Sequence, residues 1–191
     1  MSTLVMVLRT VSLLAFAGPM LLGVSGRRGE PQTPAPQSGA PRASVLANLA
    51  AFALFFPSLL IFSGSSEASM ALPLALSGLL LAVAGAALVL GSRVELGPAW
   101  SFVPKADQGT GLVTTGPYRL VRHPIYLGFV LLTLGQALAF SSWLACLILL
   151  IGIVPTFAWR ARAEETLLGR TFGERYALYR RQTKMIIPHL F

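Results

Sequence analysis

Long apolar runs alternate with short polar segments along this chain, and the runs have the length of membrane-spanning helices. A helix needs about 20 predominantly apolar residues to cross a hydrocarbon core about 30 Å thick. Three such runs lie in the first half of the chain, and a fourth extends from residue 125 to residue 159 without a charged side chain. The pattern therefore predicts an all-α integral membrane protein.

The uncharged run 125–159 is too long for one span. As a single straight helix it would measure roughly 52 Å, well beyond the thickness of the hydrocarbon core. The small polar pair Ser141-Ser142 is the natural place for the chain to turn back, so the run predicts a short helical hairpin. Together the runs predict about five transmembrane helices, at residues 4–24, 45–62, 70–90, 125–140 and 143–159.

Positive charges predict the orientation of these helices. All Lys and Arg residues except Arg9 fall in the segments 26–44, 91–124 and 160–184, which five alternating spans place on one side of the membrane. Because positively charged loops stay in the cytoplasm, we expect the N-terminus outside and the C-terminus in the cytoplasm. The segment 26–44 is rich in Pro and Gly, and it is expected to be a flexible cytoplasmic linker.

The first apolar run has a second interpretation. Arg9, a short apolar core and the small residues "GVSG" are also typical of a cleaved signal peptide. Cleavage there would leave Arg27 and Arg28 outside, so the charge pattern favours a retained span.

Composition supports a membrane protein and limits its chemistry. Of the 191 residues, 54% are hydrophobic and 12% are charged, whereas soluble domains have about 25% charged residues. The net charge of +8 is explained by membrane orientation, so we expect no nucleic-acid partner. Cys146 is the single cysteine, which excludes an intrachain disulfide and a Cys-based metal site, and we expect no metal.

The segment after residue 159 predicts a helix of a different kind. Its polar and apolar residues follow helical spacing, and we expect a C-terminal cytoplasmic amphipathic helix whose arginines contact anionic membrane lipids. The residues that recur every four positions on one face are Arg160, Glu164, Leu168, Phe172 and Tyr176.

Two polar clusters flank the predicted hairpin. One is "TTGPYRLVRHPIYLGF", residues 114–129, and the other runs from Arg160 to Glu165. Because both ends of a hairpin return to the same membrane face, we expect the clusters to meet at the cytoplasmic boundary. Their polar groups could be simple interfacial anchors, with Arg122 reaching lipid headgroups and Pro124 starting a helix. They could instead form a functional site.

The two clusters also carry a resemblance. "LVTTGPYRLVRHPIYLG", followed later in the chain by "EETLLGRTFGERYALYRRQT", resembles the isoprenylcysteine carboxyl methyltransferase family, in a wider group with the membrane phospholipid methyltransferases. The likeness covers roughly residues 97–188. It implies an S-adenosylmethionine-dependent methyltransferase that acts on a membrane-embedded lipidic acceptor by direct in-line transfer. Carboxyl methylation of an isoprenylcysteine-like substrate is the leading expectation.

The resemblance also implies roles for individual residues. Segments 110–128 and 160–176 would form the cofactor site. Arg160 would orient the carboxylate of the acceptor, and Glu165 would be the candidate base if the acceptor were an amine. The residues expected to bind the cofactor are Leu112, Val113, Tyr118, His123, Pro124, Ile125, Tyr126 and Glu164.

Three other functions stay open from the sequence. One is N-methylation of a phospholipid amine. The second is NADPH-dependent reduction of a sterol-type substrate, because such membrane reductases have a similar histidine-proline-tyrosine motif. The third is a non-enzymatic scaffold or permease, although the later spans carry almost no ionisable side chain for an ion path. We expect a bacterial plasma membrane or the endoplasmic reticulum as the location, with a lipidic or prenylated acceptor entering from the bilayer.

Overall fold

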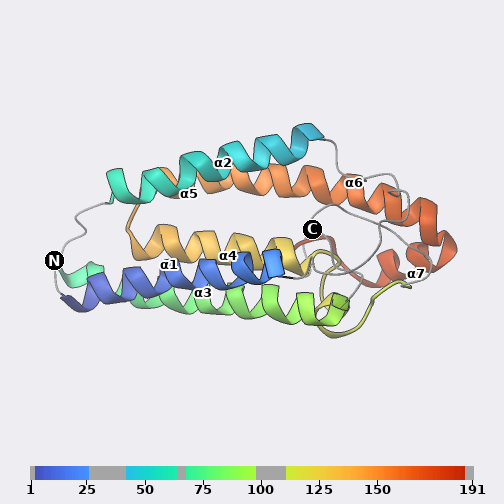
Figure 1. Cartoon of the computed structure of the whole chain (residues 1–191), viewed down its shortest axis with the longest axis horizontal. Coiled ribbons are helices and arrows are strands. Elements are labelled where there is room, and N and C mark those ends of the chain that lie inside the picture. Colours follow the sequence, from blue (N-terminus) through green and yellow to red (C-terminus); the bar gives the residue numbers. More distant parts are fainter. Residues whose placement is uncertain (1–2, 26–41, 64–67, 98–110, 188–191) are drawn as a thin grey trace.

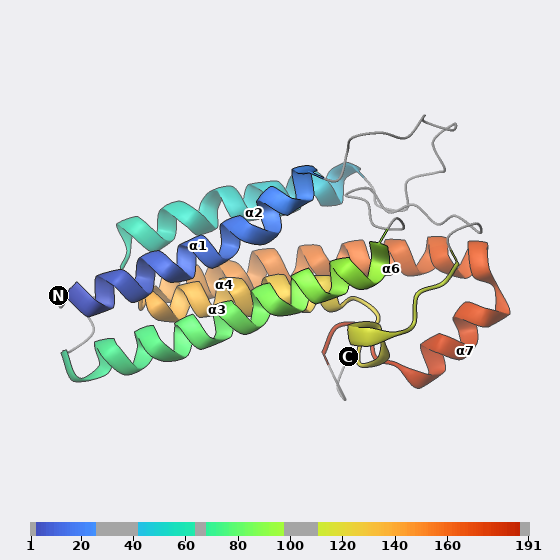
Figure 2. The ribbon, with the colours of Figure 1, turned by 60° about the horizontal axis from the view of Figure 1, so that its bottom comes forward.

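The structure is a computed structural model that describes residues 3–25, 42–63, 68–97 and 111–187. Within these ranges it consists of helices and connecting loops (Figures 1 and 2), so the expected all-α architecture is confirmed. Here η2 is a short 3₁₀ helix and η3 is a π-helical turn. The elements are α1 (Thr3–Ser25), α2 (Arg42–Ile61), α3 (Ala68–Leu96), η2 (Gly116–Arg119), α4 (Pro124–Ala139), α5 (Trp143–Ile148), η3 (Leu149–Ile153), α6 (Val154–Phe172) and α7 (Glu174–Gln182).

Three helical stretches of the described residues are long and apolar enough to cross a membrane. They are Arg42–Ile61, Met70–Leu96 and Trp143–Phe172. Thr3–Gly18 and Pro124–Ala139 are apolar but shorter. With 16 residues, α4 reaches only about 24 Å. The long apolar helices make the chain an integral membrane protein, and the count of five spans stays a prediction.

Successive long helices run in alternating directions (Figure 1). The helices α1, α3 and the continuous α5–α6 stretch point one way, whereas α2 and α4 point the other way. The N-terminus and the α4–α5 turn therefore lie at one end of the bundle, and η2, α7 and the segment 183–187 lie at the other (Figures 1 and 2). This second end, formed by residues 111–123 and 160–187, is called the polar end below.

The expected turn at Ser141-Ser142 is confirmed. The backbone of Ser141 is in the left-handed region, with a φ of 52°. Ser142 caps α5 because its Oγ accepts a hydrogen bond from Ala145 N at 3.3 Å. The same Oγ donates to Ser58 O at 3.1 Å and so attaches the turn to α2.

The helix of the second arm does not end where the expected span 143–159 ends. It continues through the π turn and α6 to Phe172. The stretch Trp143–Phe172 has 30 residues, which corresponds to about 45 Å, longer than a hydrocarbon core of about 30 Å. Its last three to four turns, which begin at Arg160 and carry the charges, therefore extend beyond the spanning part.

The expected helical face from Arg160 to Tyr176 is wrong, because the helix stops between these residues. Gly173 follows α6 with a φ of 53°, a conformation that glycine adopts without strain. The chain reverses there, and Tyr176 belongs to α7 (Figure 2). Of the expected linker 26–44, residues 26–41 lie outside the described residues, and residues 42–44 form the first turn of α2.

Glycines allow α3 and α4 to pack with their backbones in close contact. A Cβ atom added at Gly78 or Gly135 would collide with the backbone of the other helix, and the same holds for Gly85 and Gly128. Such small residues are how membrane helices approach closely. The α3–α4 pair thereby fixes the position of the N-terminus of α4, where the polar end begins.

Aromatic side chains fill the space between two layers of helices. One layer contains α1, α3 and α4, and the other contains α2 with α5 and α6 (Figure 1). The ring centroids of Phe52 in α2 and Phe157 in α6 lie 6.1 Å apart, and the centroid of Phe129 in α4 lies 6.0 Å from that of Phe157. The ring centroids of Phe16 in α1 and Phe56 in α2 lie 5.0 Å apart. This apolar core reaches the polar end through Phe157.

Arg9 is buried at the opposite end of the bundle. Its Nε donates a hydrogen bond of 2.8 Å to Ala139 O, the last residue of α4, and its guanidinium lies 5.4 Å from the centroid of the Phe140 ring. A positive charge at a helix C-terminus complements the helix dipole. Retention of α1 as a span, rather than its cleavage as a signal peptide, stays a prediction.

Candidate functional site

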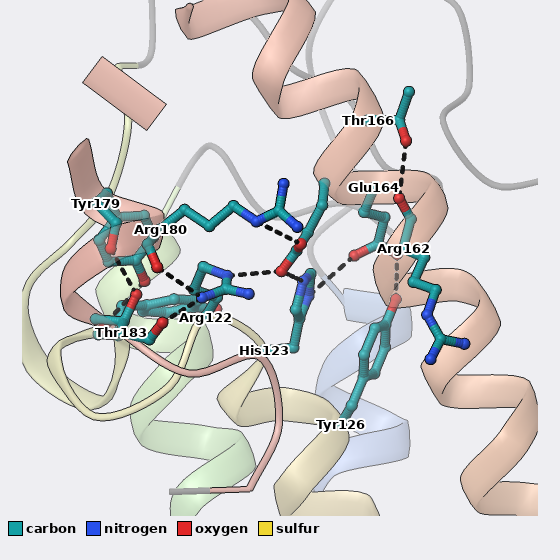
Figure 3. A network of polar contacts seen from close by, with 11 residues as sticks. Arg122, His123, Tyr126, Arg162, Glu164, Thr166, Tyr179, Arg180 and Thr183 are labelled. Carbon is teal, nitrogen blue, oxygen red and sulfur yellow. Dashed lines mark hydrogen bonds and ion pairs between the residues drawn. The ribbon is translucent and has the colours of Figure 1, made fainter. Parts of the chain in front are cut away.

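The start of α4 and the middle of α6 meet at the polar end, as the hairpin predicted (Figure 3). The Tyr126 hydroxyl donates a short hydrogen bond to Glu164 Oε1. His123 lies between two carboxylates, with Nδ1 at 3.5 Å from Glu164 Oε2 and Nε2 at 3.5 Å from Glu165 Oε1. Residues 38 to 42 positions apart thus form one cluster.

Aromatic stacking orders this cluster. The His123 and Tyr126 rings are nearly parallel, with centroids 5.5 Å apart, and Tyr126 stacks in turn on Phe157 at 4.8 Å. The Arg160 guanidinium carbon lies 5.8 Å from the centroid of the Tyr126 ring. One tyrosine therefore contacts an imidazole, a carboxylate, a guanidinium and the apolar core. Pro124 fixes where α4 begins, because proline is favoured at the first position of a helix, and it thereby places His123 directly before the helix.

Arg122 lies in the first polar segment of the sequence but is not among the expected site residues. Its Nε donates to Glu165 Oε1 at 2.6 Å, and both side chains are only 8% exposed. Its Nη1 donates to the backbone carbonyls of Thr183 and Arg180. The interpretation of Arg122 as a lipid-headgroup anchor is therefore wrong, because the guanidinium is turned inward.

The segment 183–187 lies against the cluster, although it is outside the expected site segments 110–128 and 160–176. Arg122 N donates to Lys184 O at 2.8 Å, and His123 N donates to Met185 O at 3.0 Å, around the isolated bridge between Val121 and Lys184. Met185 and Ile186 are buried against Ala161 of α6. Two backbone hydrogen bonds and an apolar contact thus fix the residues that precede α4.

The charges of the cluster shift its proton equilibria, and these groups lie at the polar end, outside the spanning segments. Burial alone lowers the pKa of His123, but the carboxylates of Glu164 and Glu165 outweigh burial and raise it. Burial alone raises the pKa of Glu165, but His123 and Arg122 outweigh it and lower this pKa to about 2. Both shifts favour the charged forms, that is, a protonated His123 between two carboxylates.

The other expected site residues are placed less centrally. Tyr118 is buried in η2, and its carbonyl accepts a hydrogen bond of 2.7 Å from the Tyr179 hydroxyl. Leu112 and Val113 are half-buried in the preceding loop. The Ile125 side chain packs against a core group between α3 and α4, so the structure does not bring it into the charged cluster.

Glu95, at the end of α3, is a further polar residue beside η2. Its carboxylate accepts a short hydrogen bond from the Thr115 hydroxyl and lies where a side chain at Gly116 would have to sit. Gly116 has a φ of 56°, which favours glycine. This contact attaches the loop before Tyr118 to α3.

Among the described residues, no group of three or more His, Cys, Asp or Glu is placed to hold a metal ion.

Comparison with known proteins agrees with this architecture. The family model described as phospholipid methyltransferase matches residues 74–175, just over half of the chain. The chain belongs to the phospholipid methyltransferase family. The matched residues include His123, Tyr126 and the α6 side chains of the cluster, but not the segment 183–187.

Individual relatives of this family member carry more specific names. It is 32% identical over 99 residues to the protein-S-isoprenylcysteine O-methyltransferase of Schizosaccharomyces pombe, covering 51% of this chain and 42% of that protein. It is 27% identical over 113 residues to the protein-S-isoprenylcysteine O-methyltransferase A of Arabidopsis thaliana, covering 58% and 57%. The chain thus spans about half the length of the curated relatives it matches.

A solved structure shares the fold. The structure of a eukaryotic intramembrane Ras methyltransferase, an isoprenylcysteine carboxyl methyltransferase, aligns with a TM-score of 0.57 at 22% identity. The alignment covers 78% of this chain and 53% of that one. The helical bundle of the phospholipid methyltransferase family member is therefore one that occurs in membrane methyltransferases.

Proposed function

We propose that this chain is an S-adenosylmethionine-dependent methyltransferase that acts on a lipidic acceptor in the membrane. Carboxyl methylation of an isoprenylcysteine-like substrate is the leading reaction. Family membership and the names of the relatives support methyl transfer. The observation that carries the proposal is the group His123, Tyr126, Arg160 and Glu164, which lies where an apolar bundle meets its polar end.

The residues present fit S-adenosylmethionine. His123 Nε2 is buried and has no hydrogen-bond partner among the described residues, so it could donate a hydrogen bond to a carboxylate of the ligand. Glu164 is an acceptor for an ammonium or for ribose hydroxyls, and the face of Tyr126 suits a cation. When bound, this cofactor would supply an electrophilic methyl group, which a carboxylate acceptor can take without giving up a proton.

Arg160 is proposed to orient the carboxylate of the acceptor. A guanidinium holds a carboxylate bidentately, and correct orientation is a large part of rate enhancement. Arg160 lies on the helix turn after Phe157 and against the Tyr126 ring, at the boundary between the apolar core and the charged cluster. A lipidic acceptor entering from the bilayer would place its polar head at this boundary.

N-methylation of a phospholipid amine is the second candidate, favoured by the description of the family. An amine acceptor must lose a proton, and Glu165 is the candidate base. The carboxylate of Glu165 is held by Arg122 at 2.6 Å and has a pKa of about 2, which makes it a weak base. This observation favours carboxyl over amine methylation.

The proposed topology has five spans, with the N-terminus outside and the polar end in the cytoplasm, where the cofactor is available. The polar end carries Arg160, Arg170, Arg175 and Lys184, in agreement with the positive-inside rule. The membrane would be a bacterial plasma membrane or the endoplasmic reticulum.

Calorimetric titration of S-adenosylmethionine into the detergent-purified protein tests the proposal. The wild type should bind, and Glu164→Gln and His123→Ala should each bind more weakly. Arg119→Gln, an exposed residue of η2, is the matched control and should bind like the wild type. Absence of binding by the folded wild-type protein, with NADPH tested in parallel, would refute the methyltransferase function.

An acceptor assay then separates the two reactions. Labelled methyl groups should pass to an S-prenylated cysteine derivative in proteoliposomes. Transfer to phosphatidylethanolamine alone would establish the amine reaction instead. Arg160→Ala should abolish most of the first activity and little of the second.

A further inference from the structure

Arg122 and His123 approach the same oxygen atom of one carboxylate. Arg122 Nε lies 2.6 Å from Glu165 Oε1, whereas His123 Nε2 lies 3.5 Å from the same atom, an ion-pair contact too long for a hydrogen bond (Figure 3). The shorter contact is a charge-assisted hydrogen bond of full strength. Glu165 Oε1 is therefore hydrogen-bonded to Arg122, although the His123 imidazole is also near this oxygen.

Arg122 is itself held in one orientation. Besides Glu165, its guanidinium donates to the carbonyls of Thr183 and Arg180, and its backbone N–H donates to Lys184 O at 2.8 Å. A guanidinium offers five donors in a planar fork, which suits several acceptors at once. The end of α7 and the segment after it thus fix the position of Arg122, and Arg122 fixes the position of Glu165.

The position of Glu165 determines which contacts the ring nitrogens of His123 can make. Its Nδ1 faces Glu164 at 3.5 Å, and its Nε2 is a buried polar atom without a hydrogen-bond partner among the described residues. Buried donors are normally hydrogen-bonded, and Nε2 makes only the long 3.5 Å contact with Glu165, so a ligand group could still accept its hydrogen bond. If Glu165 were not held by Arg122, its carboxylate could move onto Nε2 and close that position.

We propose that Arg122 is a positioning residue that holds Glu165 away from His123 and keeps Nε2 available for an anionic ligand group. That group would be the carboxylate of the amino-acid part of S-adenosylmethionine, and this identity alone rests on the proposed function. Arg122 itself does not reach the ligand. It acts through Glu165, from outside the residues assigned to cofactor binding.

The ionisation of His123 reports on this arrangement. The charged and titratable groups around His123 come from several elements. They are Arg160, Glu164 and Glu165 from α6, Tyr126 from α4, Arg122 from the preceding segment, and Arg180 and Tyr176 from α7. Loss of Arg122 removes a positive charge and lets Glu165 approach, and both changes raise the pKa of His123. Arg180 contacts the other oxygen, Glu165 Oε2, at 3.7 Å and provides a matched control.

The experiment is a histidine NMR titration of the full chain in detergent. The chain has two histidines, so a His189→Asn background leaves only the His123 signals. In this background, Arg122→Gln should raise the pKa of His123 and weaken S-adenosylmethionine binding about tenfold, the order expected when one hydrogen bond to the ligand is lost. Arg180→Gln removes the same charge from the same carboxylate but should change both quantities much less.

A double variant tests whether the effect passes through Glu165. Adding Glu165→Gln to Arg122→Gln should cancel the rise in the pKa of His123, because no carboxylate is left to approach Nε2. An unchanged pKa in folded Arg122→Gln would overturn the proposal. Equal shifts in Arg122→Gln and Arg180→Gln would also overturn it, because they would reflect charge alone.

A measurement without these variants covers the case in which Arg122→Gln does not fold. Saturating S-adenosylmethionine should shift the Nε2 resonance of His123 more than the Nδ1 resonance. Binding that leaves Nε2 unchanged would overturn the proposal. If the wild type binds no S-adenosylmethionine, the proposed function fails, and the pKa values still decide whether Arg122 restrains Glu165.

Discussion

The Tyr126 hydroxyl and the Glu164 carboxylate, 38 residues apart, share a short hydrogen bond where α4 begins and α6 leaves the apolar core. This bond joins the two polar segments of the chain across the hairpin. It also orients Glu164 beside His123, whose ring stacks on the same tyrosine. The proposed cofactor site therefore depends on a contact between two helices rather than on one sequence motif.

Replacing Tyr126 by phenylalanine tests this contact. Tyr126→Phe keeps the ring that stacks on His123 and Phe157 but removes the donor to Glu164. A hydrogen bond to a charged group is worth about 1.5–3 kcal/mol, so the variant should unfold at a lower temperature. S-adenosylmethionine binding should weaken less than in Tyr126→Ala, which also loses the stacking. Equal affinities for the two variants would show that the ring contributes nothing.

Arg160 should affect the acceptor more than the cofactor. Arg160→Ala removes the proposed orienting group, and misplacement of a substrate can reduce the rate about 100-fold. We expect kcat/KM for an S-prenylated cysteine substrate to fall by that order, while calorimetry shows little change in S-adenosylmethionine affinity. Arg162→Ala, two positions away and exposed, is the control. Full activity of Arg160→Ala would rule out the carboxylate role.

The pH dependence of ligand binding follows from His123. Its folded-state pKa is raised above the ordinary value of 6.5, so the imidazolium contributes stability that is complete below about 6.5. This contribution is lost as the pH rises through the higher, folded-state pKa. Anion binding by His123 should weaken over the same alkaline range. Calorimetry between pH 6 and pH 9 should show this loss for the wild type and not for His123→Asn.

The part of the fold that the sequence predicts follows from the length of its uninterrupted apolar runs. Blocks of apolar residues indicate helices by length alone, and the uncharged run 125–159 requires a turn, which Ser141-Ser142 supplies. The spacing of Arg160 to Tyr176 predicts one helix because each side of the break is itself helical. Gly173 is the stop signal within this stretch, since glycine commonly ends a helix.

The role of Arg122 could not be read from the sequence, for a physical reason. Two of its acceptors are the backbone carbonyls of Thr183 and Arg180, which every residue type offers, so they leave no trace in the residue pattern. Its charged partner Glu165 is 43 positions away. An arginine beside an apolar run looks the same whether it reaches lipid headgroups or turns inward.

The glycine contacts between α3 and α4 should be sensitive to a single methyl group. Gly135→Ala would place a Cβ against the backbone of Gly78 and Ala82, which cannot move without separating the helices. Overpacking of this kind costs about 1–3 kcal/mol. Gly18→Ala in α1 meets nothing within 4 Å and should be neutral or slightly stabilising. Thermal unfolding in detergent compares the two, and equal melting temperatures would contradict the close packing.

Arg9 provides a test of whether α1 is retained. Its hydrogen bond to Ala139 O and its position over Phe140 place a buried charge at the C-terminus of α4. Arg9→Met keeps the apolar stem but loses the capping interaction, which is worth up to about 2 kcal/mol when partly buried. The variant should therefore melt at a lower temperature than the wild type, whereas Thr10→Val, at an exposed position, should not. A signal peptide would be absent from the purified protein, and intact-mass measurement should instead find residues 1–25 still attached. A mass that lacks them, or an unchanged melting temperature for Arg9→Met, would show that α1 is not part of the functional bundle.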